Sequence, residues 1–568
     1  MSSELVNINQ SELTKFITQN KQVLNECEVR VGTFQNTGKF DANVDIKFFY
    51  NLKHKLDDGQ QSPILPSYTK EIKDNQGNRE FKTSLDDTFT NFTETKFNKK
   101  NNIINIDIKE YNLRLSVSKE EEKDNLKLQG NLYYRYKIRY SYSIPFGNFD
   151  LTIVYQGNNE NVIKQLPIYE IEFELKKDTD LNNLTLSKII TFMLQIRQNN
   201  SFVMSEIEKM NVINEYQNLT KQRFFIGAQP QTLHKDDLSK LYQELYSVTD
   251  KADGARYFLF VNKNKLVYLI DNNLKNVIKT DIKSNKFTNC LIDGELINSE
   301  NKSFYAFDIL YFNNTDLRGN KKYLLKERLN ELKNVVDSFT SSPIFSINIK
   351  KFIYRNVFLG SDIIMKNIQK NGYDNDGLIF TPINEPYPIK GGSWGALLKW
   401  KRPEQNTIDF YSIKKNSNEF GIGTWELYVV KHVKDPIILN RSTPTKVLFD
   451  TNKLCSETNT TVITYTTTFN DNLMDTLTGK SYITNTVIEY RWDIIESKFI
   501  PIRTRWDKTI GGESKHGNAS HVACDIWKTI NNPVLLIDII KMTNASTLTS
   551  KQSTNSILNK STVDDFFF

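Results

Sequence analysis

The sequence predicts an α+β protein of several domains that is rich in antiparallel strands. Strands in which polar and apolar residues alternate recur through the first 180 residues. Residues 181–216 have the spacing of amphipathic helix, and short strands separated by loops run through the rest of the chain. At 568 residues the chain is long enough for two to four domains, each with its own core.

Composition narrows the class of protein. The chain has 74 basic and 67 acidic side chains, a net charge of +7, which is compatible with an RNA or nucleotide partner. Its four cysteines are scattered without a Cys-x-x-Cys spacing, so we expect a reducing compartment and no zinc site. No apolar run approaches 18 residues and the first residues lack a signal-peptide core, so we expect a soluble intracellular protein without a membrane partner.

Two acidic strands stand out in the first third of the chain. After a predicted helix over residues 11–24, alternation over residues 25–32 places Glu26, Glu28 and Arg30 on one face of a strand. Residues 169–175 repeat the pattern with three glutamates on one face: Glu170, Glu172 and Glu174. Either stripe alone is compatible with a solvent-facing strand. Together, on facing walls, they would bind Mg²⁺ or Mn²⁺ through carboxylate oxygens.

Basic strands lie between the acidic ones. Arg135, Lys137 and Arg139 share one face of a strand over residues 134–141, and Arg114 belongs to another predicted strand. Acidic and basic stripes with strand periodicity together predict an antiparallel β-barrel. Its lumen would carry a metal on one side and phosphate-binding cations on the other.

This arrangement resembles the tunnel-type, metal-dependent RNA triphosphatases of fungi, protozoa and large DNA viruses. The resemblance covers about the first 215 residues and rests on Glu26-x-Glu28-x-Arg30, Lys137-x-Arg139-x-Ser141, Asp150-Leu151-Thr152 and Glu170-x-Glu172-x-Glu174. It implies that the five glutamates hold the metal. It also implies that Arg135, Lys137 and Arg139 grip the γ-phosphate of a 5'-triphosphate RNA.

The next element is Lys251-Ala252-Asp253-Gly254-Ala255-Arg256, which leads into an apolar strand. A deprotonated lysine amine can attack the α-phosphorus of a nucleoside triphosphate and hold the nucleotide as a phosphoamide. Neighbouring cations and partial burial favour the neutral amine, and Gly254 would let the backbone approach the nucleotide closely. In a chain this rich in lysine and aspartate, the tetrapeptide Lys-x-Asp-Gly alone is weak evidence.

Five further elements follow in order: Asp293-Gly294-Glu295, Phe304 to Leu310, Asp376-Gly377-Leu378-Ile379-Phe380, Leu397-Leu398-Lys399-Trp400-Lys401, and Arg503-Thr504-Arg505-Trp506-Asp507-Lys508. The series resembles the covalent nucleotidyltransferase superfamily of capping enzymes and nucleic-acid ligases. It covers residues 221–530, and its last element is more similar to that of GTP-using mRNA guanylyltransferases than to that of DNA ligases. A structural role for Phe307 or for solvent-facing Lys399 and Lys401 stays open when each residue is considered alone, and Trp400 and Trp506 are expected to pack.

The resemblance implies a role for each element. Lys251 is the nucleophile, with Asp253 and Gly254 in its nucleotide-binding element. Arg256 holds the ribose or a phosphate, Glu295 contacts the sugar or a metal, and Phe307 stacks on the base. Asp376 helps to hold the metal, and Lys399 and Lys401 neutralise the α-phosphate. The remaining four, Arg503, Arg505, Asp507 and Lys508, orient the leaving pyrophosphate when the last domain closes.

The end of the chain reads as short strands over residues 408–413, 425–430, 462–467 and 487–492. They predict an oligonucleotide-binding-type (OB-fold) barrel. Residues 543–568 are rich in Ser, Thr, Asn and Lys and are expected to be disordered. We expect domains at 1–220 (tunnel-type triphosphatase), 221–402 (nucleotidyltransferase) and 403–542 (OB-fold).

These features predict an mRNA capping enzyme that is both a hydrolase and a transferase. It would remove the RNA γ-phosphate with Mg²⁺ or Mn²⁺ and then transfer GMP from GTP through lysyl-GMP. No Gly-x-Gly-x-Gly turn for S-adenosylmethionine is present, so the resemblance implies a separate cap methyltransferase, together with an RNA polymerase, as partners. It also implies the cytoplasm and a virus or virus-like element. Two alternatives remain: an ATP-dependent RNA or DNA ligase, and a degenerate RNA-binding transcription subunit.

Overall fold

The computed structural model describes residues 5–20, 25–98, 101–119, 121–123, 126–164, 166–177, 179–243, 245–297, 302–354, 356–370, 372–434, 442–455, 465–509 and 516–542. The chain forms two compact units, residues 1–211 and 212–568. Both units combine helices with mainly antiparallel sheets, which confirms the predicted α+β class. In the part of the chain that the structure describes, no helix is long and apolar enough to cross a membrane.

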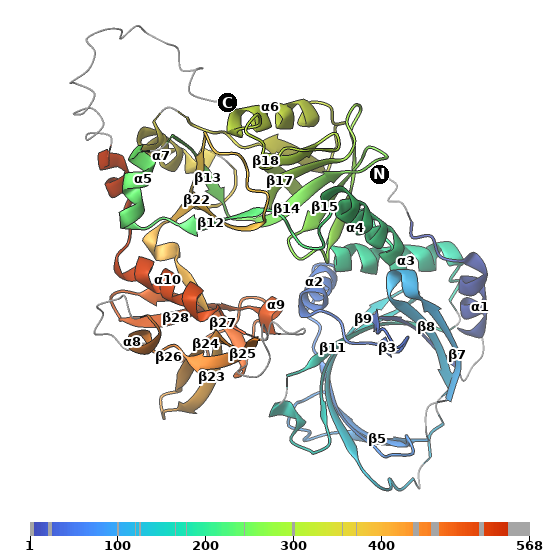
Figure 1. Ribbon diagram of the computed structural model, residues 1–568. Coiled ribbons are helices and arrows are strands. Elements are labelled where there is room, and N and C mark those ends of the chain that lie inside the picture. The colour runs from blue at the N-terminus through green and yellow to red at the C-terminus, as the bar shows by residue number, and fades with distance from the viewer. Residues whose placement is uncertain are drawn as a thin grey trace, which may run out of the picture. The chain divides into compact units, whose positions relative to one another are not determined.

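The first unit is built on one curled nine-stranded sheet (Figure 1). Its strand order is β6-β5-β4-β9-β10-β11-β1-β8-β7, and every pairing is antiparallel. The strands are β1 (Asn25–Val31), β4 (Ser67–Lys73), β5 (Arg79–Ser84), β6 (Thr93–Phe97), β7 (Asn101–Ile108), β8 (Leu113–Lys119), β9 (Tyr133–Ile144), β10 (Gly147–Gly157) and β11 (Ile168–Leu175). Among these described strands β6 and β7 remain the two edges, so the pairings form a curled sheet and not a closed barrel.

Strand alternation divides the side chains of this sheet between its two faces. On β1, Cys27, Val29 and Val31 are fully buried, whereas the residues between them line a cavity. The helices α1 (Gln10–Asn20), α2 (Ile46–Asp57) and α3 (Asn183–Gln198) bury apolar residues such as Phe16, Phe49 and Ile190. The predicted helical stretch over residues 181–216 is two helices, because Asn199 takes a left-handed conformation at the end of α3. The second helix, α4 (Glu206–Thr220), follows a loop.

The second unit contains two sheets that carry the predicted nucleotidyltransferase elements. A four-stranded sheet has the order β12-β22-β21-β13, with β12 (Ala228–Thr232), β13 (Tyr246–Ala252), β21 (Asn375–Pro382) and β22 (Gly392–Lys401). A seven-stranded sheet runs β16-β15-β14-β17-β18-β19, and β20 (Phe345–Ile349) pairs with β18. Its other strands are β14 (Ala255–Val261), β15 (Leu266–Asp271), β16 (Val277–Lys283), β17 (Cys290–Ile297), β18 (Lys302–Phe312) and β19 (Thr315–Asp316). Helix α6 (Leu325–Val336) buries its leucines in the core of this sheet, and α5 (Leu238–Gln243) and α7 (Val357–Lys366) complete this part.

The rest of the unit is a six-stranded antiparallel sheet with the order β25-β24-β23-β27-β28, in which β26 also pairs with β24. Its strands are β23 (Thr407–Ser417), β24 (Ile422–Lys434), β25 (Ser442–Leu448), β26 (Thr466–Asn470), β27 (Thr486–Asp493) and β28 (Lys498–Thr504). Three predicted strands are confirmed. The fourth, predicted over residues 462–467, lies partly outside the described residues, and β26 begins at Thr466. Around its core lie α8 (Thr451–Leu454), α9 (Trp506–Thr509) and α10 (Ser520–Asn531), with Trp425 and Trp527 fully buried.

Two of the four scattered cysteines form a disulfide, which does not fit the expected reducing compartment. Cys455, just after α8, forms a disulfide with Cys524 of α10 across 69 residues of sequence. Cys27 and Cys290 are free and buried. Scattered spacing did not reveal the pair, because the two cysteines meet only when α10 packs on the C-terminal sheet. The expected disorder of residues 543–568 lies outside the described residues.

Candidate active sites

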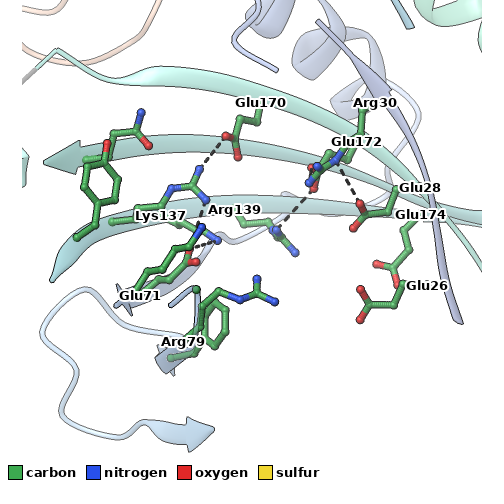
Figure 2. Close-up of a pocket in the computed structure, with 16 residues that line it drawn as sticks. Glu26, Glu28, Arg30, Glu71, Arg79, Lys137, Arg139, Glu170, Glu172 and Glu174 are labelled. Carbon is green, nitrogen blue, oxygen red and sulfur yellow. Dashed lines mark hydrogen bonds and ion pairs between the residues drawn. The ribbon is translucent and has the colours of Figure 1, made fainter. Parts of the chain in front are cut away.

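The concave face of the nine-stranded sheet holds a cavity of about 630 Å³ (Figure 2). All eight metal and phosphate residues predicted for the first unit line it: Glu26, Glu28, Arg135, Lys137, Arg139, Glu170, Glu172 and Glu174. They come from β1, β9 and β11. Strand period therefore sends the predicted acidic and basic stripes into one space.

The two glutamate stripes lie side by side and not on facing walls. Strands β1 and β11 are paired neighbours, with Glu28 opposite Glu174 and Arg30 opposite Glu172. Directly opposed residues of an antiparallel pair lie close enough for their side chains to interact. The expectation of two facing acidic walls is thus wrong, and the acids form one wall.

Ion pairs divide the five glutamates. Arg30 lies 2.5 Å from a Glu172 oxygen and 3.2 Å from a Glu28 oxygen, and Arg135 lies 2.7 Å from Glu170. Burial raises the pKa of Glu172, but Arg30 and Arg139 outweigh it and lower that pKa to about 2. Glu170 and Glu172 are therefore bound to arginines at 2.7 Å or less, and Glu28 shares Arg30 at the longer distance.

Glu26, Glu28 and Glu174 gather at one end of the cavity (Figure 2). Burial and then the nearby Asp150, Glu28 and Glu26 carboxylates raise the pKa of Glu174 to about 7. Among the described residues no three His, Cys, Asp or Glu side chains are arranged as they stand to hold a metal ion. The crowding of carboxylates that favours protonation of Glu174 is nevertheless the condition that a divalent cation relieves, so the donor set fits a hard cation.

The structure adds Glu71 and Arg79 to this site, which the sequence interpretation missed. Glu71 of β4 is 3% exposed and lies 2.6 Å from Lys137 and 3.3 Å from Arg135. Burial raises its pKa, but Lys137 and Arg135 outweigh burial and lower the pKa to about 2. Arg79 of β5 also lines the cavity. The alternation Thr69, Glu71, Lys73 is the same signal that revealed the other strands.

A second cavity, of about 270 Å³, lies in the second unit between the four-stranded and the seven-stranded sheet. Lys251, Arg256, Glu295, Phe307 and Lys399 line it. Lys251 is the sixth residue of β13, and its neighbour strand β21 brings Gly377 opposite it. A side chain at Gly377 would collide with the Trp400 carbonyl oxygen at 1.9 Å, so glycine is required for β21 to pass this close to β22.

Asp376 joins two of the predicted lysines. One of its carboxylate oxygens accepts a hydrogen bond from Lys251 Nζ at 2.7 Å, and the other lies 2.6 Å from Lys401 Nζ. Burial raises the pKa of Asp376, but Lys251 and Lys401 outweigh burial and lower it. Lys399, two residues before Lys401, lines the cavity. Its pKa is lowered by burial and then by Lys251 and Lys401.

Arg256 is already engaged inside the protein. Its guanidinium donates to both carboxylate oxygens of the fully buried Asp293, at 2.9 and 2.6 Å, and to the Ala228 carbonyl at 2.7 Å. It also lies 5.6 Å from the Phe307 ring centroid. These contacts make Arg256 a support of the cavity wall beside Phe307, which differs from the expected direct hold on ribose or phosphate.

Two residues of the lysine element are not in the cavity wall. Asp253 and Gly254 are exposed and do not line the cavity. A side chain at Gly254 would meet the Leu296 carbonyl oxygen at 2.7 Å and Glu295 Cγ at 2.8 Å. The close approach that requires glycine is thus to β17, whereas we expected an approach to the nucleotide.

The last predicted element lies elsewhere in the second unit and does not line the cavity. Its basic residues pair with two acids of the C-terminal sheet: Arg503 with Glu489 at 2.7 Å, Arg505 with Asp409 at 2.7 Å and Lys508 with Asp409 at 2.6 Å. Arg505 also pairs with Asp507 of the same element at 3.0 Å. The packing roles expected for two tryptophans agree with the structure, since Trp400 and Trp506 are buried.

Lys350 is a cavity residue that the sequence did not reveal. It is 6% exposed, lines the cavity and donates to the Asp250 main-chain oxygen at 2.9 Å. Glu295 on the same wall has its pKa raised by burial. Lys350 stands beside a second lysine in a plain Lys-Lys-Phe run, so local sequence gave no sign of its burial.

Comparison with known proteins shows which proteins the segment around the second cavity is similar to. Residues 191–403 match the family model described as "mRNA capping enzyme, catalytic domain". That segment carries Lys251, Arg256, Asp376, Lys399 and Lys401. The segment is thus similar to the catalytic domain of mRNA capping enzymes.

Sequence similarity to one viral relative covers more of the chain than the family model does. The probable mRNA-capping enzyme of Acanthamoeba polyphaga mimivirus is 29% identical over 503 residues, covering 74% of this chain and 42% of that protein. The mouse mRNA-capping enzyme is 30% identical over 209 residues, covering 33% of this chain and 34% of that protein. The chain thus spans less than half the length of these relatives. A solved mimivirus capping enzyme triphosphatase covers 33% of this chain and 96% of its own at 14% identity, with a TM-score of 0.27.

Proposed function

We propose that this chain is a bifunctional mRNA capping enzyme. The first unit would hydrolyse the γ-phosphate of a 5'-triphosphate RNA, and the second would transfer GMP from GTP to the resulting diphosphate end. The observation that carries the proposal is that Lys251, which lines a cavity together with Lys399, donates to Asp376, all inside the segment that matches the capping-enzyme model. The proposed domains are residues 1–220, 221–402 and 403–542, the first a triphosphate tunnel and the last an OB-fold barrel.

The guanylyl transfer would have two steps. Lys251 Nζ attacks the α-phosphorus of GTP, a nitrogen–phosphorus bond forms and pyrophosphate leaves. A terminal oxygen of diphosphate RNA then attacks the same phosphorus, and the lysine amine leaves. Such chemistry depends mainly on positioning and on charge stabilisation. Asp376, at 2.7 Å from the amine, orients it, while Lys399 and Lys401 supply positive charge for the phosphate.

The base and sugar would lie against the apolar side of the cavity. Phe307 offers a flat ring for the guanine. The Arg256 guanidinium, which Asp293 binds, lies against this ring. Arg503, Arg505, Asp507 and Lys508 would contact pyrophosphate only after a movement of the C-terminal sheet, since their present partners are Glu489 and Asp409.

In the first unit, Glu26, Glu28 and Glu174 would hold a Mg²⁺ or Mn²⁺ ion, which supplies Lewis-acid activation of the phosphate. Arg135, Lys137 and Arg139 would bind the γ-phosphate from β9, next to Glu71, which fixes the first two. Glu170 and Glu172 orient arginines of the wall. We also propose that the protein acts in the cytoplasm, in a virus or virus-like element, and that a cap methyltransferase activity and an RNA polymerase work with it.

The test is incubation with α-labelled GTP and, in parallel, α-labelled ATP, each with a divalent cation, followed by a denaturing gel. A band with GTP alone, acid-labile and alkali-stable, is the expected result. A band with ATP would assign the chain to the ligases. No band with either nucleotide would favour a degenerate RNA-binding subunit.

A further inference from the structure

Helix α10 carries an acidic residue that reaches the strand next to Lys399. The Asp525 carboxylate lies 2.7 Å from His234 Nε2, and the Thr232 hydroxyl also hydrogen-bonds to it. Thr232 ends β12, and His234 begins the short helical turn that follows. Ala228, Gln229 and Pro230 of the same strand line the nucleotide cavity.

The contact coincides with the pairing of Lys399. Strands β12 and β22 run parallel with Thr232 opposite Lys399, and the Leu233 N–H donates to the Lys399 carbonyl at 2.8 Å. Asp525 therefore grips the residues on both sides of Leu233. A displacement of Thr232 and His234 would therefore reach the Lys399 main chain through the hydrogen bond from Leu233.

The charges of Asp525 and Lys399 also influence each other. Burial lowers the pKa of Lys399, and Lys251 and Lys401 lower it further, while Asp525 and Asp376 oppose them. Asp376 already binds Lys251 and Lys401. Burial raises the pKa of Asp525, but His234, Thr232 and Lys399 outweigh burial and keep it low, so Asp525 is an anion at neutral pH.

Apolar packing on both sides fixes the position of α10. Ala523 and Trp527 of the helix are fully buried in the core of the C-terminal sheet. Val534 and Ile539, which follow the helix, lie in the core beside Trp400, and the Trp400 indole N–H donates to the Val534 carbonyl at 2.7 Å. The helix is thus held between two cores, which fixes the place of Asp525 although its side chain is 44% exposed.

We propose that Asp525 is a positioning residue for nucleotidyl transfer, which holds the end of β12 and, through the pairing of β12 with β22, the main chain of Lys399 beside the nucleotide cavity. The inference rests on the proposed guanylyl transfer and deepens it. It gives helix α10 a part in the chemistry, because Asp525 of α10 contacts the residues on both sides of Leu233, which pairs with Lys399.

The experiment uses the full chain and measures the rate of covalent GMP formation against GTP concentration. The variants are Asp525→Asn, Asp525→Glu and His521→Gln, the last an exposed residue of the same helix. We expect Asp525→Asn to lower the maximal rate about tenfold, the usual size for loss of a hydrogen-bonded charge contact. The half-saturating GTP concentration should change less than about twofold, because GTP still meets the same cavity wall. Asp525→Glu should recover most of the rate, and His521→Gln should match the native chain.

Thermal unfolding of each variant separates positioning from folding. A maximal rate of Asp525→Asn within twofold of native overturns the proposal, as does an equal loss in Asp525→Glu. If Asp525→Asn does not fold, His234→Ala decides instead: a slowed adduct supports the proposal and a native rate overturns it. A native chain that forms no adduct overturns the proposed function and this inference with it, whereas native labelling with unchanged variants overturns this inference alone.

Discussion

Replacing Glu174 with glutamine tests the electrostatics of the N-terminal cavity. Burial and the carboxylates of Asp150, Glu28 and Glu26 raise the pKa of Glu174 from 4.5 to about 7. In the unfolded chain the side chain returns to a pKa of roughly 4.3. The folded state therefore holds a proton that the unfolded state releases between these values.

This difference in pKa sets how the unfolding free energy changes with pH. A raised carboxyl pKa costs no stability below the unfolded value, costs progressively more as pH rises, and reaches its full cost above about pH 7. The folded value of about 7 and the unfolded value of roughly 4.3 differ by about 4 kcal/mol in free energy, which screening by solvent at this half-buried site reduces to about 2 kcal/mol. Glutamine removes the cost because it does not ionise.

The measurement is hydrogen exchange of peptides that cover β1 and β11, at several urea concentrations, in a chelator, at pH 5 and pH 8. Glu110→Gln is the control, since it makes the same charge change at an exposed position. Between pH 5 and pH 8, Glu174→Gln should gain about 2 kcal/mol of unfolding free energy over the native chain, and Glu110→Gln should follow the native chain. A Glu174→Gln curve parallel to the native curve would refute the reasoning.

Three further outcomes are expected. Lys251→Ala should abolish covalent GMP labelling but leave γ-phosphate release intact; labelling that persists in this variant contradicts the nucleophile assignment. Asp293→Asn strands the buried Arg256 guanidinium and should lower the urea-unfolding free energy by about 3 kcal/mol, whereas the exposed Asp253→Asn should change it by less than about 0.5 kcal/mol; equal effects would show that the pair is not structural. Reducing the Cys455–Cys524 bond should cost about 2–4 kcal/mol in the same assay, and Cys455→Ser should abolish the effect of reductant; a reductant effect that survives in Cys455→Ser would contradict the pairing.

Local periodicity predicted many of the strands and many of the residues of both sites. Side chains two apart on a strand share a face whatever the strand pairs with. The alternation around Glu28, Glu172 and Lys137 therefore placed these residues in one cavity before any pairing was known. The same alternation marks Glu71, which the sequence interpretation missed although the signal was present.

Strand register and long-range packing decided the rest. The sequence by itself determined the α+β class, the eight predicted residues that face the first cavity and the order of the predicted nucleotidyltransferase elements. Only the tertiary structure decided that β1 and β11 are neighbours, that Arg256 donates to Asp293, and that Cys455 forms a disulfide with Cys524. It also brought Asp525 to His234 across 291 residues. The physical reason is that periodicity is local, whereas a partner across a sheet or between two cores depends on which segments pair and in which register.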